Sequence, residues 1–88
     1  MKTNRKKILN KILNYLKKNN PMISSTKDIP LNKYLFKLGY LDSMGIYNLV
    51  MYLEKNFKIK IEGEEIILEK FGTIKNIVDL VYGKIKKK

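Results

Sequence analysis

The fold is decided by residues 39–57, which read GYLDSMGIYNLVMYLEKNF. Asp42 and Ser43 are of the residue types that cap helix N-termini, because their side-chain oxygens accept hydrogen bonds from unpaired backbone N–H groups. The apolar residues that follow recur at intervals of three and four, which is typical of a helix with one buried face. These residues are Ile46, Leu49, Val50, Leu53 and Phe57. The stretch predicts an amphipathic helix over about 43–56.

A first amphipathic helix is predicted over 4–18. Its apolar residues share helical spacing, while most of its lysines fall elsewhere. The apolar residues are Ile8, Leu9, Ile12, Leu13 and Leu16. Thr3 is the expected N-cap. Pro21 ends the helix, because proline lacks a backbone N–H and disfavours helix at the residue before it.

The remaining segments predict a long loop over 20–33 and one helical turn over 35–38. Residues 57–61 alternate like a strand, but no second strand exists to pair with them, so we expect an extended connector. A short helix is predicted over 64–68, with acidic residues at its N-terminal end. Thr73 caps a last helix. The apolar stripe of that helix is Ile74, Ile77, Val78, Val81 and Ile85.

These elements predict an all-α fold, a small four-helix bundle of three longer helices and one short helix. The chain has 88 residues, of which 44% are hydrophobic and 31% charged. A chain of this size buries roughly 60–70% of its unfolded surface, enough for one core. We therefore expect a single domain over 1–88. No apolar run approaches the length of a membrane span, and no signal-peptide core follows Met1, so a cytoplasmic location is expected.

The chain contains neither His nor Cys. Zinc sites, thiol nucleophiles and His-based triads all need these side chains, so we expect no metal site and no enzyme of these classes. Ser43 also fails as a hydrolase nucleophile. The G-x-S-x-G elbow requires glycine two residues before the serine, where this chain has Leu41.

The net charge is +11 and is unevenly distributed. Residues 1–37 hold ten basic side chains and one acidic, whereas residues 38–83 hold five basic and seven acidic. One interpretation is a small basic helical module that binds nucleic acid or an anionic membrane surface. We favour a solvated surface, because the basic residues are 18 Lys and one Arg, and proteins that read base edges favour Arg. No nucleic-acid partner is therefore expected.

Three ordered pieces carry a resemblance to a known family: Leu35-Phe36-x-x-Gly39-Tyr40-Leu41-Asp42-Ser43-Met44; Leu49-Val50-x-x-Leu53-Glu54-x-x-Phe57-x-Ile59-x-Ile61; and Glu64-Glu65 with Phe71-Gly72-Thr73-Ile74-x-x-Ile77-x-x-Leu80-Val81. Together they resemble the acyl carrier protein family, which includes peptidyl and D-alanyl carriers. The resemblance implies a 4′-phosphopantetheine arm, derived from coenzyme A, on Ser43, with acyl or aminoacyl groups held as thioesters. It implies that Asp42 assists attachment; the alternative role of Asp42 is the helix cap alone.

The resemblance also implies partners: a phosphopantetheinyl transferase, an acyl- or aminoacyl-activating ligase or acyltransferase, and downstream acyl-processing enzymes. The expected contact residues are Leu41, Met44, Tyr47, Asn48 and Lys55. Two residues separate Gly39 from Asp42, where fatty-acid-synthesis members usually have one. This spacing and the basic surface favour a stand-alone carrier of a specialised pathway over one of bulk fatty acid synthesis. We also expect the carrier to be monomeric, and to be acted on by enzymes and not itself one.

Overall fold

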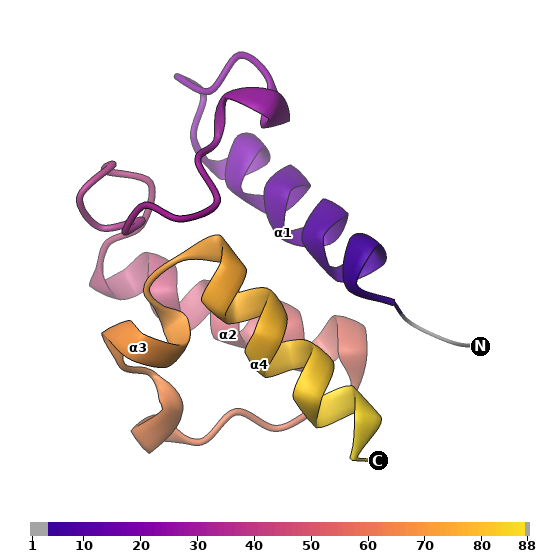
Figure 1. Cartoon of the computed structure of the whole chain (residues 1–88). Coiled ribbons are helices and arrows are strands. Elements are labelled where there is room, and N and C mark those ends of the chain that lie inside the picture. Colours follow the sequence, from indigo (N-terminus) through magenta and orange to yellow (C-terminus); the bar gives the residue numbers. More distant parts are fainter. Residues whose placement is uncertain (1–3, 88) are drawn as a thin grey trace.

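The computed structural model describes residues 4–87 and is all-helical over that range. Its α-helices are α1 (Arg5–Asn19), α2 (Ser43–Phe57), the short α3 (Leu68–Phe71) and α4 (Ile74–Lys86). Two 3₁₀ turns, η1 (Thr26–Asp28) and η2 (Gly63–Glu65), lie in the connections. Figure 1 shows α1 beside α4, with α2 behind α4. The predicted all-α bundle of three longer helices and one short helix is confirmed. Among residues 4–87, no helix is both long and apolar enough to span a bilayer.

Helix α1 buries one stripe, formed by Ile8, Ile12 and Leu16. Its N-cap is Asn4, whose Oδ1 accepts a hydrogen bond from the Lys7 N–H at 2.9 Å. The predicted cap, Thr3, lies outside the described residues. The helix ends at Asn19, as Pro21 requires.

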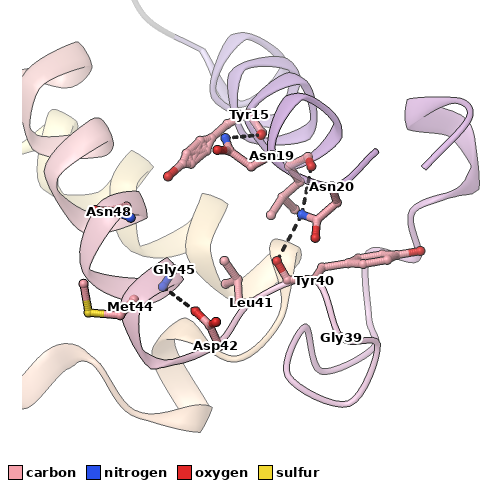
Figure 2. A pocket seen from close by; sticks show the side chains of 11 residues that line it. Tyr15, Asn19, Asn20, Gly39, Tyr40, Leu41, Asp42, Met44, Gly45 and Asn48 are labelled. Atoms are coloured by element: carbon pink, nitrogen blue, oxygen red, sulfur yellow. Dashed lines mark hydrogen bonds between the residues drawn. The ribbon is translucent and has the colours of Figure 1, made fainter. Parts of the chain in front are cut away.

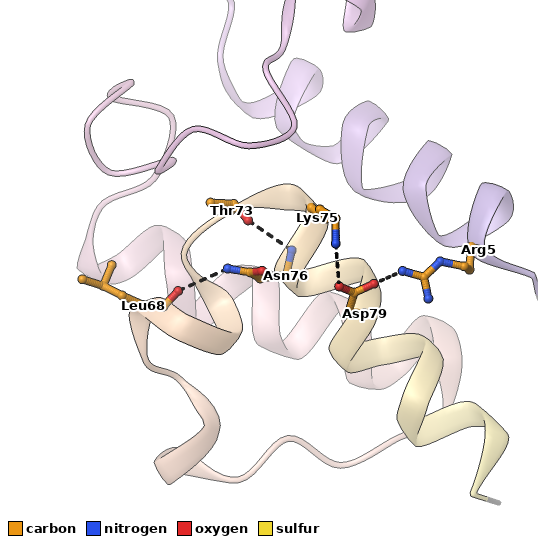
Figure 3. A network of polar contacts seen from close by, with 6 residues as sticks. All are labelled: Arg5, Leu68, Thr73, Lys75, Asn76 and Asp79. Atoms are coloured by element: carbon orange, nitrogen blue, oxygen red, sulfur yellow. Dashed lines mark hydrogen bonds and ion pairs between the residues drawn. The ribbon is translucent and has the colours of Figure 1, made fainter.

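Helices α2 and α4 supply most of the remaining core. The buried residues of α2 are Leu49, Val50, Leu53 and Phe57, and those of α4 are Ile74, Ile77, Val78 and Val81. Helix α4 is capped as predicted, by Thr73 Oγ1, which accepts from the Asn76 N–H at 3.1 Å (Figure 3). The predicted core residue Ile46 is only half-buried, at the edge of the core.

The predicted short helix over 64–68 is wrong in its position. Residues 63–65 form the 3₁₀ turn η2, and α3 begins only at Leu68. The Glu65 N–H donates to Glu62 O at 3.0 Å and the Ile66 N–H to Gly63 O at 3.1 Å, which closes the turn. Glu65 Oε1 caps it by accepting from the Glu62 N–H at 2.8 Å. The backbone at Ile67 is then extended (φ −128°, ψ 163°), which separates the two elements.

The connector after α2 carries no strand within residues 57–61, as predicted. Lys58 adopts the left-handed conformation (φ 53°), which ends the helix. The Glu54 carboxylate accepts from the Ile61 N–H at 2.9 Å and ties the connector back to α2. Ile61 is buried.

The long connection between α1 and α2 is anchored to the rest of the fold before α2 begins. At its far end, residues 35–38 form the predicted turn, which Gly39 closes with φ 78°. The Tyr40 N–H donates to Leu35 O and the Gly39 N–H to Phe36 O, at 3.1 Å each. This is the hydrogen-bond pattern of a Schellman motif, which favours glycine at the left-handed position. Leu35 is buried, and its N–H donates to Gly72 O at 3.0 Å.

Candidate functional site

Ser43 is the first residue of α2 and is exposed. Asp42 is the N-cap, and its Oδ1 accepts from the Gly45 N–H at 2.7 Å. The Ile46 N–H donates to Asp42 O at 2.9 Å and closes the first turn. The structure therefore gives Asp42 the capping role, and it places the Ser43 hydroxyl on a rigid helix start with open access.

Gly45 allows the cap to sit close against the helix. A Cβ at this position would lie 3.1 Å from Asp42 Oδ1 and 3.3 Å from a Leu41 methyl group. Both distances are tighter than ordinary van der Waals contact. Sequence reasoning missed this role, although a glycine within the first turn of a predicted helix is itself unusual and was the available signal.

Asn20 fixes the loop that leads to Ser43. Its side chain is buried, and its Nδ2 donates to Leu16 O at 2.9 Å and to Tyr40 O at 3.1 Å (Figure 2). The amide thus joins the end of α1 to the residues that precede the helix start. Sequence reasoning missed Asn20, because asparagine before proline signals only a helix end and a loop.

The predicted partner-contact residues divide between surface and core. Met44, Tyr47, Asn48 and Lys55 are exposed on α2, with Met44 69% and Tyr47 64% exposed. Leu41 is buried at 8% exposure and lies beneath the helix start. Met51, which the sequence did not predict as a contact residue, is 60% exposed. Met44, Tyr47 and Met51 follow three- and four-residue spacing and therefore form one exposed apolar stripe along α2.

A cavity of about 350 Å³ opens between the end of α1 and the start of α2 (Figure 2). Most of its lining side chains can form hydrogen bonds. The lining residues are Tyr15, Leu16, Asn19, Asn20, Gly39, Tyr40, Leu41, Asp42, Met44, Gly45 and Asn48. The side of α2 toward α3 has a smaller hollow of about 210 Å³, lined by Phe36, Ile46, Ile66, Ile67, Leu68, Phe71 and Gly72.

Two tyrosines pack together beside the larger cavity. The Tyr15 and Tyr52 rings lie with their centroids 4.6 Å apart. Burial, and to a smaller extent the neighbouring Tyr52, raises the pKa of Tyr15 above its ordinary value. The Tyr15 phenol therefore stays protonated throughout the physiological range and remains a hydrogen-bond donor.

Part of the basic surface is paired within the molecule. Arg5 and Lys75 both form ion pairs with Asp79 (Figure 3). The Arg5 guanidinium also lies 5.2 Å from the centre of the Tyr82 ring. Lys84 pairs with Glu65 at 2.8 Å. Two cations that the nucleic-acid interpretation would use, Arg5 and Lys84, are thus paired with acidic side chains of this protein.

The chain matches one family model, described as "Phosphopantetheine attachment site", over residues 7–81. No curated protein matches it. The match spans α1, α2, α3 and most of α4, and it confirms the resemblance predicted from the sequence. Domains of this family are non-catalytic carriers that hold 4′-phosphopantetheine covalently and interact with modifying and processing enzymes.

Proposed function

Because this chain belongs to the family of phosphopantetheine attachment domains, we propose that it is an acyl or aminoacyl carrier protein with its arm on Ser43. The observation that carries the proposal is the exposed serine at the capped start of α2. A loop fixed by Asn20 and Gly39 precedes it, so a modifying enzyme meets the hydroxyl in one defined position.

The attachment step follows from the chemistry of the group. The Ser43 Oγ attacks the phosphorus of coenzyme A that bears the pantetheine. A new Oγ–P bond forms as the bond from this phosphorus to the bridging oxygen breaks, and adenosine bisphosphate leaves. The hydroxyl proton passes to a base of the transferase. The product is a phosphodiester anion at a helix N-terminus, where unpaired N–H groups and the helix dipole favour negative charge. Asp42, adjacent to Ser43, would help to bind the transferase and its metal ion in addition to capping the helix.

The protein contributes position and reach, and its partners contribute catalysis. A phosphopantetheinyl transferase installs the arm, an activating ligase or acyltransferase loads it, and downstream enzymes receive the acyl group. Met44, Tyr47, Asn48 and Lys55 form the contact surface, which Met51 extends. Leu41 does not contact partners directly. Because it is buried, it supports the start of α2 by packing beneath it.

We further propose that residues 1–88 act as one monomeric carrier domain in a specialised pathway of the cytoplasm. Its α2 surface lacks the acidic row on which salt-bridge docking depends, because Asn48 and Lys55 occupy exposed positions there. Docking therefore relies on apolar contact more than on charge. The family match over residues 7–81 supports the carrier function over the nucleic-acid or membrane-surface function. Arg5 and Lys84, which the latter function would use, are moreover paired with acidic side chains of the same molecule.

The test is intact-mass spectrometry before and after incubation with coenzyme A, magnesium and a broad-specificity phosphopantetheinyl transferase. The wild type gains one phosphopantetheine group, and Ser43→Ala gains none. Ser24→Ala is the matched control, because Ser24 is an exposed serine in the α1–α2 connection, and it gains the group as the wild type does. A Ser43→Ala protein that is still modified would refute the site. A folded, initially unmodified wild type that gains nothing would refute the function.

A further inference from the structure

We propose that the cavity between α1 and α2 is the resting site of the pantetheine arm. The inference rests on the proposed function, since it requires an arm on Ser43. Asp42 and Met44, the residues on either side of Ser43, both line the cavity, and so does Gly45 (Figure 2). An arm that starts at Ser43 therefore starts at the rim of this cavity.

The lining matches the polar groups of the arm. Pantetheine carries two amides and a hydroxyl, which need hydrogen-bond partners when they leave water. The Nδ2 groups of Asn19 and Asn20 are already used, donating to Tyr15 O and to Leu16 O and Tyr40 O. Their Oδ1 atoms accept no hydrogen bond from other described residues and are available to the amide N–H groups of the arm. The Asn48 side chain makes no hydrogen bond with the described residues 4–87, so its amide can donate to the carbonyls of the arm.

The size and continuation of the cavity also suit a flexible chain. Its volume of about 350 Å³ falls within the range of sites that hold small ligands. A second hollow of about 340 Å³, lined by Asn14, Tyr15, Lys18, Asn19 and Tyr52, shares Tyr15 and Asn19 with the first. The two hollows adjoin at Tyr15 and Asn19, and together we call them the groove. A chain that starts at Ser43 and follows the groove reaches the Tyr15–Tyr52 pair. The far end of the arm then lies against these two rings.

The competing location is the hollow on the α3 side of α2. Its lining side chains are apolar, so the amides of the arm would lose their hydrogen bonds with water there and gain none from side chains. That hollow suits an aliphatic chain better than the arm itself. The two locations make opposite predictions about which protein protons lie near the arm.

The experiment is isotope-filtered NMR on uniformly labelled protein that carries an unlabelled arm, with its mass checked first. The proposal predicts NOEs from the arm to Tyr15, Asn19 and Asn48. NOEs to Ile67 and Leu68 in their place, or no NOEs beyond Met44, would overturn it. A mass spectrum without the added group would refute the proposed function and this inference together, whereas a modified protein without the predicted NOEs refutes the inference alone.

A variant pair measures the contribution of one lining residue. Asn48→Ala removes a single hydrogen bond from the groove and lowers the docked-to-undocked ratio of the arm about five-fold, read from the apo-to-holo chemical-shift change at Tyr15. Asn10→Ala is the control, because Asn10 is an exposed asparagine of α1 that does not line the groove, and it leaves the ratio unchanged. Both changes favour helix, so both proteins remain folded. An unchanged ratio in Asn48→Ala would contradict the assignment.

Discussion

Two hollows flank the start of α2, and they differ in size and chemistry. The hollow on the side that faces α1 is larger and is lined by several amide side chains, whereas the hollow on the side that faces α3 is smaller and apolar. The first side is built by the end of α1, where Asn19 and Asn20 follow the last buried turn. The second is built by Ile66, Ile67 and Leu68 between η2 and α3. One helix start thus separates two environments, and an attached group meets a different chemistry depending on the side to which it turns.

The largest expected effect concerns the anchor of the polar side. Asn20→Ala leaves the carbonyls of Leu16 and Tyr40 without their side-chain donor and lowers the free energy of unfolding by about 2–3 kcal/mol. Urea denaturation followed by circular dichroism measures the change. Asn19→Ala is the control, because its exposed amide bonds only within its own helix, and it stays within about 0.5 kcal/mol of the wild type. Equal losses in the two variants would show that Asn20 does not anchor the loop.

The second largest effect is expected at Gly72 on the apolar side, where the Leu68 carbonyl and the Tyr34 ring lie close to the glycine backbone. A Cβ at this position would lie 2.6 Å from Leu68 O and 2.8 Å from a carbon of the Tyr34 ring. Gly72→Ala therefore forces the backbone and the ring to move and costs about 1–3 kcal/mol of unfolding free energy. Gly83→Ala, in α4 with nothing within 4 Å of its added Cβ, gains about 0.5–1 kcal/mol. The same denaturation assay measures both, and a stabilised Gly72→Ala protein would contradict the packing described for this side.

A smaller effect is expected on the exposed stripe between the two sides. Met44→Ala removes an apolar contact with the transferase and lowers kcat/KM for phosphopantetheine attachment about ten-fold, equivalent to about 1.4 kcal/mol. Met22→Ala is the matched control, since Met22 is 66% exposed, close to the 69% of Met44, but lies in the α1–α2 connection. If both variants were modified at the wild-type rate, Met44 would not be a contact residue.

The smallest effect is a pH dependence on the apolar side. The hydrogen bond from Lys84, with a backbone hydrogen bond at Glu62, lowers the pKa of Glu65. A lowered pKa adds stability at pH values above the ordinary range of glutamate, about pH 4, and this stability is lost as the pH falls through the folded-state pKa. Glu65→Gln therefore reduces the melting temperature near neutral pH and flattens its fall toward acid. Glu64→Gln, at an exposed position, leaves the fall of the melting temperature toward acid pH unchanged. If Glu65→Gln also left this fall unchanged, the role of the Glu65–Lys84 pair would be refuted.

Sequence reasoning reached the three longer helices because their apolar spacing and capping residues act locally. The Thr73 cap was predicted at the exact residue. For α2 the sequence predicted a start at about residue 43 with Asp42 or Ser43 as the cap, and the structure selects Asp42. The short helix was misplaced because Glu64 and Glu65 favour any helical N-terminus, whereas the extended backbone at Ile67 stops the helix after the single turn η2. The Asn20 anchor could not be predicted, because its second acceptor, Tyr40 O, lies twenty residues away. Asn20 and Tyr40 both line the cavity, whose lining comes from residues distant in the sequence and could not be predicted either.

The most direct test of the central claim is to locate the arm after modification. Cleavage after lysine releases residues 38–55, a peptide in which Ser43 is the only serine or threonine. Mass spectrometry of the digested holo-protein should place one phosphopantetheine group on this peptide, and fragmentation should place it on Ser43. The group found on any other peptide, or on a tyrosine within this one, would contradict the account.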